Sequence, residues 1–356
     1  MFEELTQTSD RYKIFPSDAL KTVALVEASL LRGARKYLNN NEYLEVVVPH
    51  VVTASGSCEI IETLLELQYF DRQAFLTQTA QLYLEALVPF LGGKVYTFGP
   101  SFRAESRVDS RHLVEFSLLE LEFEGNFEKL LNTIEELFMS MIKEVLFLPI
   151  NTEHLTKLKT PFKRFTYEEA INTLNLEWGN DIYSTDEQEL LKINNNQPYF
   201  ITHFPKELKY FNMRENNDDP RVVNSADFIV PHGGECVGAA EREHNPNILL
   251  KRLNKSSMYI NLVAKGGDSK SFDWYIKAYY SYPYKLHSGF GMGLNRVTKF
   301  ALQLNDIRQS TIYPVNRATI IKGRVKQPYY RIIYIHQLPT LQNNIAIIKK
   351  SIFFSI

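Results

Sequence analysis

Residues 115–125, EFSLLELEFEG, alternate apolar and acidic side chains with the two-residue period of a β-strand. The alternating positions are Leu119, Glu120, Leu121, Glu122, Phe123 and Glu124. Such a strand has one face to bury and one face lined by carboxylates, so it requires a sheet that other elements cover on one side. The preceding β-rich segment, KVYTFGPSFRAE at residues 94–105, is expected to pair with it as a hairpin.

Helical periodicity marks the elements that would cover this sheet. Residues 17–38 place their apolar side chains on one stripe, and residues 126–147 form a second amphipathic pattern. The first helix leads into a β-rich segment, residues 43–49, which ends at Pro49. Strands that are joined by long connections, with helices outside them, predict an α+β fold with a mainly antiparallel sheet.

The remaining segments predict one insertion and several further strands and helices. Residues 150–198 are polar and asparagine-rich, and we expect an irregular insertion there rather than an independent domain. The other expected elements are a strand turning into a helix at 74–91, strands at 198–205 and 225–231, a helix near 271–281, and a glycine-rich strand-to-helix turn at 287–302.

Charge is distributed unevenly along the chain. The 40 basic and 41 acidic side chains give a net charge of −1 at pH 7, so charge alone predicts no general affinity for nucleic acid. Beyond Asp306 there are eight basic and no acidic residues, which leaves 32 basic and 41 acidic side chains up to that point, a net of −9.

The two cysteines and the N-terminus bear on the compartment. Cys58 and Cys236 show no metal-binding spacing and suit a reducing compartment. We find no signal-peptide pattern, and no apolar run approaches the roughly 20 residues that a membrane helix needs. We therefore expect a cytoplasmic protein with no membrane contact.

The loop between the two hairpin strands, SFRAESRVDSRHLVEF at residues 101–116, concentrates arginines. Arg103, Arg107 and Arg111 can direct guanidinium groups into a shared space, and guanidinium forks suit phosphate oxygens. Phe116, at the start of the return strand, can offer a ring face to a base. An exposed hairpin held by weak Arg–Glu pairs would have the same composition, so this segment alone leaves both interpretations open.

A glycine-rich turn, GFGMGLNRV at residues 289–297, is a second candidate for binding a ligand. Gly289, Gly291 and Gly293 allow the backbone to approach a ligand closely, and Arg296 falls in the first turn of the following helix. Tight packing of a strand against a helix would need the same glycines. No βαβ unit surrounds the turn, so it is not a dinucleotide-binding fingerprint.

Two carboxylates flank a Pro-His-Gly-Gly turn at residues 231–234. Asp227 and Glu235, eight residues apart, are suited to hold a Mg²⁺ ion that also touches substrate phosphates. The small residues from Gly238 onward leave space for a ligand, and Arg242 adds a cation. A tight hairpin with a salt bridge is the alternative. The histidines have no metal-ligand spacing.

The order of these segments resembles the three motifs of class II aminoacyl-tRNA synthetases. The asparaginyl, aspartyl and lysyl subgroup is the most similar, and the asparaginyl type within it. The resemblance covers residues 17–317 and rests on a helix and strand ending at Pro49, the FRAE…RHL-EF hairpin, GFGMGLNR, and the segments LTQTAQLYLEA, EWGNDI, FPKELKYFNM and WYIKAYY. It implies a six- to seven-stranded, mainly antiparallel sheet flanked by helices, and a homodimer built around Pro49 and its helix.

The resemblance also implies roles in binding ATP and Mg²⁺. Arg103 would bind the α-phosphate, Arg296 would bind the γ-phosphate, and both would act in catalysis together with Glu235. Phe116 would stack on adenine, with Arg296 over the other face, and Asp227 and Glu235 would hold Mg²⁺. The other residues implied to bind ATP are Glu105, Arg111, His112, Gly291 and Gly293.

The amino-acid site is implied to be of the asparagine type. Leu84 and Glu85 stand where aspartate-specific relatives carry a lysine, so Glu85 would accept from a side-chain amide and Arg242 would donate to its oxygen. Glu59 and Gln81 would hold the α-amino group, beside Gly238. Asparagine is favoured as the substrate and aspartate is the alternative, because a carboxylate facing Glu85 would be disfavoured.

The sequence departs from the family pattern at several positions. Only sixteen residues precede the first motif helix, whereas an anticodon-binding domain needs roughly a hundred. We therefore expect the N-terminal anticodon-binding domain of the family to be missing, with residues 1–16 as a short extension. Asn295 stands where an acidic residue is usual, and Gln309 and Val315 stand where an aspartate and an arginine are usual. The basic residues 318–356 are either a loosely packed tail or a contact to the tRNA backbone.

These departures leave three functions in view. The first is ATP-dependent activation of asparagine, as in an asparagine–tRNA ligase, with the tRNA acceptor end as a candidate partner. The second is tRNA-independent synthesis of asparagine from aspartyl-adenylate and ammonia. The third is a non-catalytic paralogue that binds ATP or an amino acid.

Overall fold

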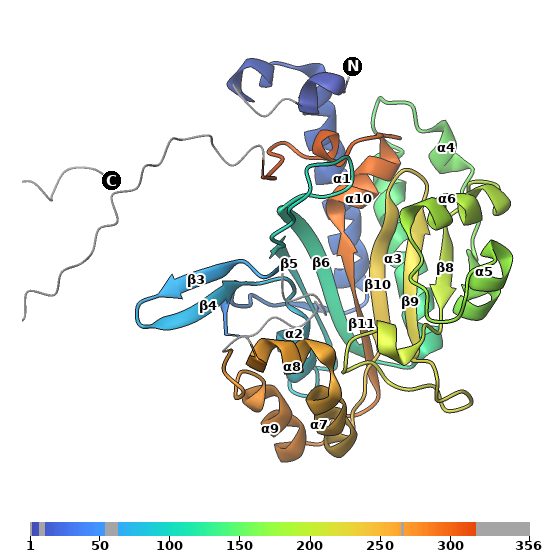
Figure 1. The fold of residues 1–356 in the computed structure, drawn as a ribbon. Coiled ribbons are helices and arrows are strands. Elements are labelled where there is room, and N and C mark those ends of the chain that lie inside the picture. The colour runs from blue at the N-terminus through green and yellow to red at the C-terminus, as the bar shows by residue number, and fades with distance from the viewer. Residues whose placement is uncertain (1, 7–10, 54–62, 265–266, 318–356) are drawn as a thin grey trace, which may run out of the picture. The chain divides into compact units, whose positions relative to one another are not determined.

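The computed structural model describes residues 2–6, 11–53, 63–264 and 267–317 (Figure 1). The chain divides into two compact units, residues 1–320 and residues 321–356, and the described residues belong to the first. The predicted tail at 318–356, the loop that contains Cys58 and Glu59, and the short N-terminal segments at residues 1 and 7–10 lie outside the described residues.

The centre of the described fold is an eight-stranded sheet in the order β1-β5-β6-β11-β10-β9-β8-β7. Its strands are β1 (Leu44–Glu45), β5 (Lys94–Phe102), β6 (Glu115–Glu124), β7 (Lys163–Thr166), β8 (Tyr199–Thr202), β9 (Ser225–Val230), β10 (Gly234–Glu241) and β11 (His287–Gly293). The pairs β1–β5 and β7–β8 are parallel and the others antiparallel. The mainly antiparallel α+β fold is confirmed.

Helices and a smaller sheet surround this centre. The α-helices are α1 (Asp18–Asn40), α2 (Gln81–Leu87), α3 (Phe127–Val145), α4 (Glu153–Thr156), α5 (Tyr167–Leu174), α6 (Ser184–Ile193), α7 (Pro246–Lys255), α8 (Ser257–Ala264), α9 (Asp273–Ser281) and α10 (Leu294–Ala301). The second sheet joins β2 (Val51–Val52), β4 (Arg72–Leu76) and β3 (Glu66–Tyr69). Short 3-10 turns occur at Glu3–Thr6, Arg11–Ile14, Lys206–Leu208 and Ile307–Ser310.

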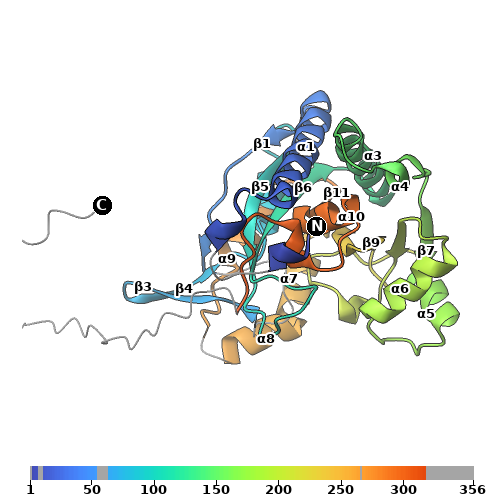
Figure 2. The same cartoon turned by 90° about the horizontal axis from the view of Figure 1, so that it is seen from above.

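Helices α1 and α3 lie side by side along one face of the large sheet (Figure 2). Their apolar stripes pack with Leu119, Leu121 and Phe123 of β6 in the largest core cluster. Gly33 permits the close approach of the two helices, because a Cβ there would lie 2.5 Å from the backbone oxygen of Ser140. Helices α7, α8 and α9 pack in a separate cluster with residues of β2, β4 and α2.

The carboxylate face of β6 differs from a solvent-facing row. Glu120 is 5% exposed and Glu122 is 1% exposed, so both faces of the strand are covered at these positions. The alternation predicted the strand and its two faces correctly. It gave no information about the elements that cover the acidic face, because those elements come from distant parts of the chain.

The prediction of an irregular structure at residues 150–198 is wrong, and the sheet has eight strands where six or seven were expected. The insertion contains α4, β7, α5 and α6, and β7 extends the sheet edge beside β8. Its apolar residues, among them Tyr167, Leu190 and Leu191, form a core cluster together with residues of β8 and β9. Short elements between asparagine-rich turns carry too few periodic positions to be recognised.

Candidate functional site

A cavity of about 470 Å³ lies over the acidic face of the large sheet. It brings together thirteen of the predicted site residues, which come from four strands, two loops and two helices. They are Gln81, Arg103, Glu105, Arg111, His112, Phe116, Asp227, Glu235, Gly238, Arg242, Gly291, Gly293 and, on α10, Arg296. Glu85 lies beneath the wall, fully buried, and Glu59 is outside the described residues.

Arginines from two distant segments form the cationic part of the cavity. Arg103 follows directly on β5, and its backbone N–H donates to Val114 at 2.8 Å, which closes the base of the hairpin. Its Nε is buried and has no hydrogen-bond acceptor among the described residues. Arg296, in the first turn of α10, donates to the backbone oxygen of Glu235 at 2.6 Å. A buried guanidinium donor without an acceptor is suited to an anionic ligand.

Phe116 and the loop tip complete this side of the cavity. The guanidinium of Arg103 lies 5.4 Å from the centre of the Phe116 ring, a cation–π distance. His112 Nδ1 lies 2.8 Å from Asp109, which also accepts from the backbone N–H groups of Arg111 and His112. These bonds hold the tip so that Arg111 and His112 both reach the cavity.

Two carboxylates near Glu235 on the opposite side of the cavity, Asp227 and Glu187, have raised pKa values. Burial raises the pKa of Asp227 to about 7, against the attraction of Lys209 and with the repulsion of Glu235 and Glu187. Burial and Glu235 likewise raise the pKa of Glu187, against Arg111 and Arg296. Lys209 Nζ donates to both oxygens of Asp227, at 2.8 and 2.7 Å.

The same carboxylates decide whether a divalent cation fits. In the described ranges, no three His, Cys, Asp or Glu side chains converge as a ready metal site. Asp227 and Glu235 nevertheless line one cavity, and their mutual repulsion is the charge excess that a divalent cation would neutralise. The two carboxylates therefore fit a Mg²⁺ ion that is also coordinated by a phosphate. Binding of the ion requires Lys209 to release its hydrogen bonds to Asp227.

Glu85 is the centre of a buried polar network at the other end of the cavity. Its Oε1 accepts from Gln81 Nε2 at 2.8 Å and Asn212 Nδ2 at 2.6 Å. Its Oε2 accepts from the hydroxyls of Tyr275 at 2.5 Å and Tyr279 at 3.2 Å. Each oxygen of the carboxylate thus accepts two hydrogen bonds. The donors lie on α2, on α9 and in the segment before β9, and together they fix the orientation of the carboxylate.

Arg242 connects this network to the sheet. Its Nη2 lies 2.6 Å from Glu122 and its Nε lies 3.5 Å from Glu85. Burial raises the pKa of Glu122 to about 8, because the attraction of Arg242 is countered by the neighbouring Glu85. Gly289 makes room for the pair, since a Cβ there would lie 2.0 Å from the Glu122 carboxylate. The sequence suggests that Gly289 leaves space for a ligand, but in the structure it leaves space for the buried side chain of Glu122.

The departures from the family pattern each have a local structural role. Asn295 is 4% exposed, and its Oδ1 accepts from the Ser117 backbone while its Nδ2 donates to Ser310. A carboxylate could not make the second bond. Gln309 Oε1 accepts from the Asp306 N–H at the start of a 3-10 turn. Val315 accepts from the backbone N–H of Val114 at 2.7 Å and so supports the arginine hairpin.

Several residues at this site were not anticipated from the sequence. Lys209 and Asn212 lie in the segment FPKELKYFNM, which was used for the resemblance as a whole. Glu187 lies in the insertion that was expected to be irregular. A polar residue between apolar neighbours is the signal that could have singled out Asn212, because buried polar side chains need partners.

The comparison with known families is decisive at this point. The family described as "tRNA synthetases class II (D, K and N)" matches residues 3–317. The chain belongs to this family. As a class II tRNA synthetase it is an enzyme, a ligase that forms an aminoacyl-adenylate. The predicted family is thus confirmed.

Curated relatives of this class II synthetase include both members of the asparagine and aspartate pair. An asparagine–tRNA ligase from Thermococcus gammatolerans is 38% identical over 315 residues, covering 84% of this chain and 70% of the relative. An aspartate–tRNA(Asp) ligase from Thermoplasma volcanium is 33% identical, covering 89% of this chain and 73% of the relative. The chain thus matches most, but not all, of each relative.

Solved structures agree with the sequence comparison. The asparaginyl-tRNA synthetase from Pyrococcus horikoshii, in complex with asparaginyl-adenylate, superposes with a TM-score of 0.77 at 33% identity, covering 86% of this chain and 71% of that one. The enzyme from Entamoeba histolytica, also in complex with asparaginyl-adenylate, gives a TM-score of 0.76 at 30% identity, with 87% and 70% covered. None of the helices among the described residues could cross a membrane.

Proposed function

We propose that this class II synthetase activates asparagine with ATP, as an asparagine–tRNA ligase does. The observation that carries the proposal is the cavity that joins three arginines, a pair of carboxylates and the Glu85–Arg242–Glu122 network over one sheet face. Relatives of the asparagine type, two of them with bound asparaginyl-adenylate, support the choice of amino acid. Neither alternative function is favoured by these comparisons.

The arginines supply the electrostatics of the reaction in this proposal. The substrate carboxylate attacks the α-phosphorus of ATP, the bond to the bridging oxygen breaks, and diphosphate leaves with its electron pair. Arg103, with its buried Nε, stabilises the charge that builds on the α-phosphate, and Arg296 holds the γ-phosphate. Phe116 offers its ring to adenine, beneath Arg103 in this structure.

Other residues that line the cavity would contact the rest of the nucleotide. Glu105, Arg111 and His112 order the phosphates and sugar from the loop. Gly291 and Gly293 allow the nucleotide to approach the backbone. Asp227 and Glu235 would hold Mg²⁺, which neutralises phosphate charge when bound.

Amino-acid selection rests on a carboxylate that is held in place before the substrate arrives. Glu85 accepts an amide donor and repels a carboxylate, and Arg242 donates to the side-chain oxygen of asparagine. Gln81, together with Glu59 outside the described residues, would hold the α-amino group beside Gly238. A bound asparagine must therefore share or replace the Gln81 and Asn212 hydrogen bonds to Glu85.

The partners and the compartment are inferred in the same way. Apolar side chains near Pro49 are exposed, Val47 by 95%, and Leu44 and Val51 by 48% each, which supports a homodimer built on this segment. The tRNA acceptor end would approach the loop tip near Arg107. We assign residues 17–317 to one catalytic domain, with 1–16 as an extension and 318–356 as a basic tail, in a cytoplasmic enzyme.

Amino-acid-dependent exchange of labelled diphosphate into ATP tests this function directly. Exchange should depend on asparagine, with aspartate much weaker, and Arg103→Ala should abolish it without unfolding the protein. Arg164→Ala, which removes a surface arginine paired with Glu128, is the matched control and should exchange normally. Wild-type exchange in Arg103→Ala, or exchange that prefers aspartate, would contradict the assignment.

A further inference from the structure

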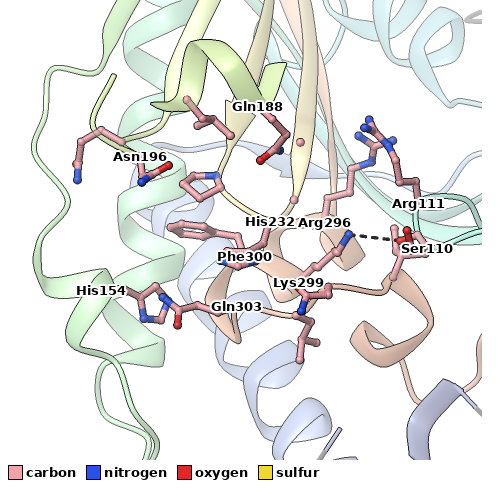
Figure 3. Close-up of a pocket in the computed structure, with 18 of the residues that line it drawn as sticks. Ser110, Arg111, His154, Gln188, Asn196, His232, Arg296, Lys299, Phe300 and Gln303 are labelled. Carbon is pink, nitrogen blue, oxygen red and sulfur yellow. Dashed lines mark hydrogen bonds between the residues drawn. The ribbon is translucent and has the colours of Figure 1, made fainter. Parts of the chain in front are cut away.

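A second cavity, of about 680 Å³, lies behind the nucleotide cavity, between α10, the turn from β9 to β10, and the helices of the insertion (Figure 3). In Figure 3, Arg111, Arg296 and Lys299 lie on one side of it, and His154 and Asn196 lie on the other. The function proposed above assigns it nothing.

The lining of this second cavity is strongly biased toward positive charge. Four cationic side chains reach it, Arg111, Lys157, Arg296 and Lys299, together with His154 and several amides. None of the described residues that line it is an aspartate or a glutamate. A concave surface with cations and amide donors, but no carboxylate of its own, attracts an anion.

Lys299 is the most informative of these cations. It is 6% exposed, and its Nζ donates to the backbone oxygen of Ser110 at 3.3 Å. It forms no salt bridge with any carboxylate of the described residues. Burial, followed by the repulsion of Arg296 and Arg111, lowers the pKa of Lys299 to about 8. An anion in the cavity would relieve both effects.

His154 supplies an independent observation on the opposite wall. Its Nε2 is buried and has no hydrogen-bond partner among the described residues. Burial lowers the pKa of its ring, whereas hydrogen bonds to the backbone of Phe300 and Ala301 raise it. Those bonds use the single N–H of the neutral ring, so Nε2 donates to an anion when the ring is protonated, the form that the charge of an anion favours. A buried polar atom that lines a cavity and lacks a partner is explained most simply by a ligand.

The negative charges nearby offset only part of the positive charge of the lining. Glu187 lies 3.4 Å from Arg111 and Glu153 lies 2.6 Å from Lys157, so these two carboxylates offset part of the charge of those cations, while Lys299 has no such partner among the described residues. Asp306 and Asp109 attract Lys299 from a distance, and each already has a closer partner, Arg308 and His112 respectively.

Two of the cations connect the cavity to the nucleotide site. Arg111 and Arg296 line both cavities, so the same two guanidinium groups are counter-charges for an anion in either one. We propose that the second cavity binds inorganic diphosphate, the leaving group of the adjacent reaction, with Lys299 and His154 as its own contacts. The identity of the anion rests on the proposed function, whereas the anion site itself does not.

Calorimetric titration with sodium diphosphate separates the two sites. In Arg103→Ala, which removes a guanidinium that lines the nucleotide cavity and not the second one, diphosphate should still bind, and adding Lys299→Gln should weaken that binding about tenfold, the usual loss of one charge-assisted hydrogen bond. Lys299→Arg keeps the charge and should retain binding. Loss of all binding in Arg103→Ala alone would place diphosphate only in the nucleotide site and overturn the proposal.

A pair of exposed lysines gives a control that does not depend on a buried substitution. Lys157 and Lys277 both form an (i, i+4) ion pair, with Glu153 and Asp273, but only Lys157 lines the cavity. Lys157→Gln should weaken binding about two- to threefold, since an exposed charge contributes less, and Lys277→Gln should not. Equal effects of the two, or orthophosphate binding as tightly as diphosphate, would refute the assignment.

These outcomes are distinct from a failure of the proposed function. A protein without asparagine-dependent exchange would refute the activation of asparagine, yet its diphosphate titrations would still report on the second cavity. In an active enzyme, Lys299→Gln should also change inhibition by added diphosphate more than it changes the KM for ATP.

Discussion

Asn212 is the buried residue whose substitution tests the site most stringently. It is fully buried, and its Nδ2 donates to Glu85 Oε1 at 2.6 Å while its Oδ1 has no donor among the described residues. The bond to a charged acceptor contributes about 1.5–3 kcal/mol, and a buried acceptor without a partner costs about 1–3 kcal/mol. Asn212→Leu removes both the favourable hydrogen bond and the unfavourable unpaired acceptor. Because these two effects have opposite signs, the free energy of unfolding should change by less than about 2 kcal/mol.

Asn212→Asp has the same shape but should behave very differently. It places a second carboxylate beside Glu85, and two unit charges about 4 Å apart repel by about 4 kcal/mol at an effective dielectric constant of about 20. The new carboxyl would have a raised pKa in the folded state. Its protonated form can donate to Glu85, so the stability that is lost at pH 8 should return in part at pH 5.

Urea unfolding of both variants at the two pH values measures these effects. The exposed Asn172 on α5 provides the control, and its Leu and Asp substitutions should each change stability by less than about 0.5 kcal/mol. The reasoning fails if Asn212→Leu loses more than about 4 kcal/mol, or if Asn212→Asp is equally stable at pH 5 and pH 8. In diphosphate exchange, Asn212→Leu should lower the preference for asparagine over aspartate, because one of the donors that orient Glu85 is gone.

Three other substitutions test separate parts of the structure. Gly289→Ala should lose about 1–3 kcal/mol in urea unfolding because its Cβ overlaps a buried carboxylate, whereas Gly291→Ala, with its nearest atom at 3.6 Å, should lose less. Burial raises the pKa of Glu27 on α1 to about 7, so its ionisation opposes folding as pH rises from about 4.5 through 7. Glu27→Gln should therefore raise stability by up to about 3 kcal/mol at pH 8 and change it little at pH 4; an equal effect at both would contradict this. Lys209→Met should destabilise the protein by about 3 kcal/mol at pH 8, because it leaves the ionised Asp227 without its ion-pair partner. The loss should be much smaller at pH 5, where Asp227 is protonated, and a loss of stability that does not depend on pH would refute this prediction.

The long elements could be predicted because they carry their own periodicity. Helix α1 begins at Asp18 with Ser17 accepting from the Ala19 N–H, and α3 covers Phe127–Val145, as their stripes and caps indicate. The hairpin of β5 and β6 is likewise where the alternation placed it. Helices α7 and α8 and strand β3 were not anticipated, and β3, with four residues, is too short for its pattern to stand out.

The grouping of the candidate residues around one cavity could be predicted, but their pairings could not. The order of the motifs indicated that Arg103, Asp227 and Arg296 belong to one cavity, and they do line one. Nothing in the local sequence shows that Lys209 would pair with Asp227, 18 residues away, or that Arg242 would pair with Glu122, 120 residues away. Such pairs depend on the registers of neighbouring strands and on the elements that cover them.

The sequence by itself determined the family, the main strands and helices, and the chemical character of the segments, since these depend on residues close together or on the order of motifs. Only the tertiary structure decided which of those charges are buried. The carboxylates of β6 become the floor of a cavity because β11 supplies glycines opposite them and Arg242 supplies a counter-charge. Lys299 is buried because residues from the β5–β6 loop, the turn from β9 to β10 and the insertion enclose the cavity that its side chain enters. Burial of a charge depends on everything that surrounds it, and those surroundings come from the whole chain.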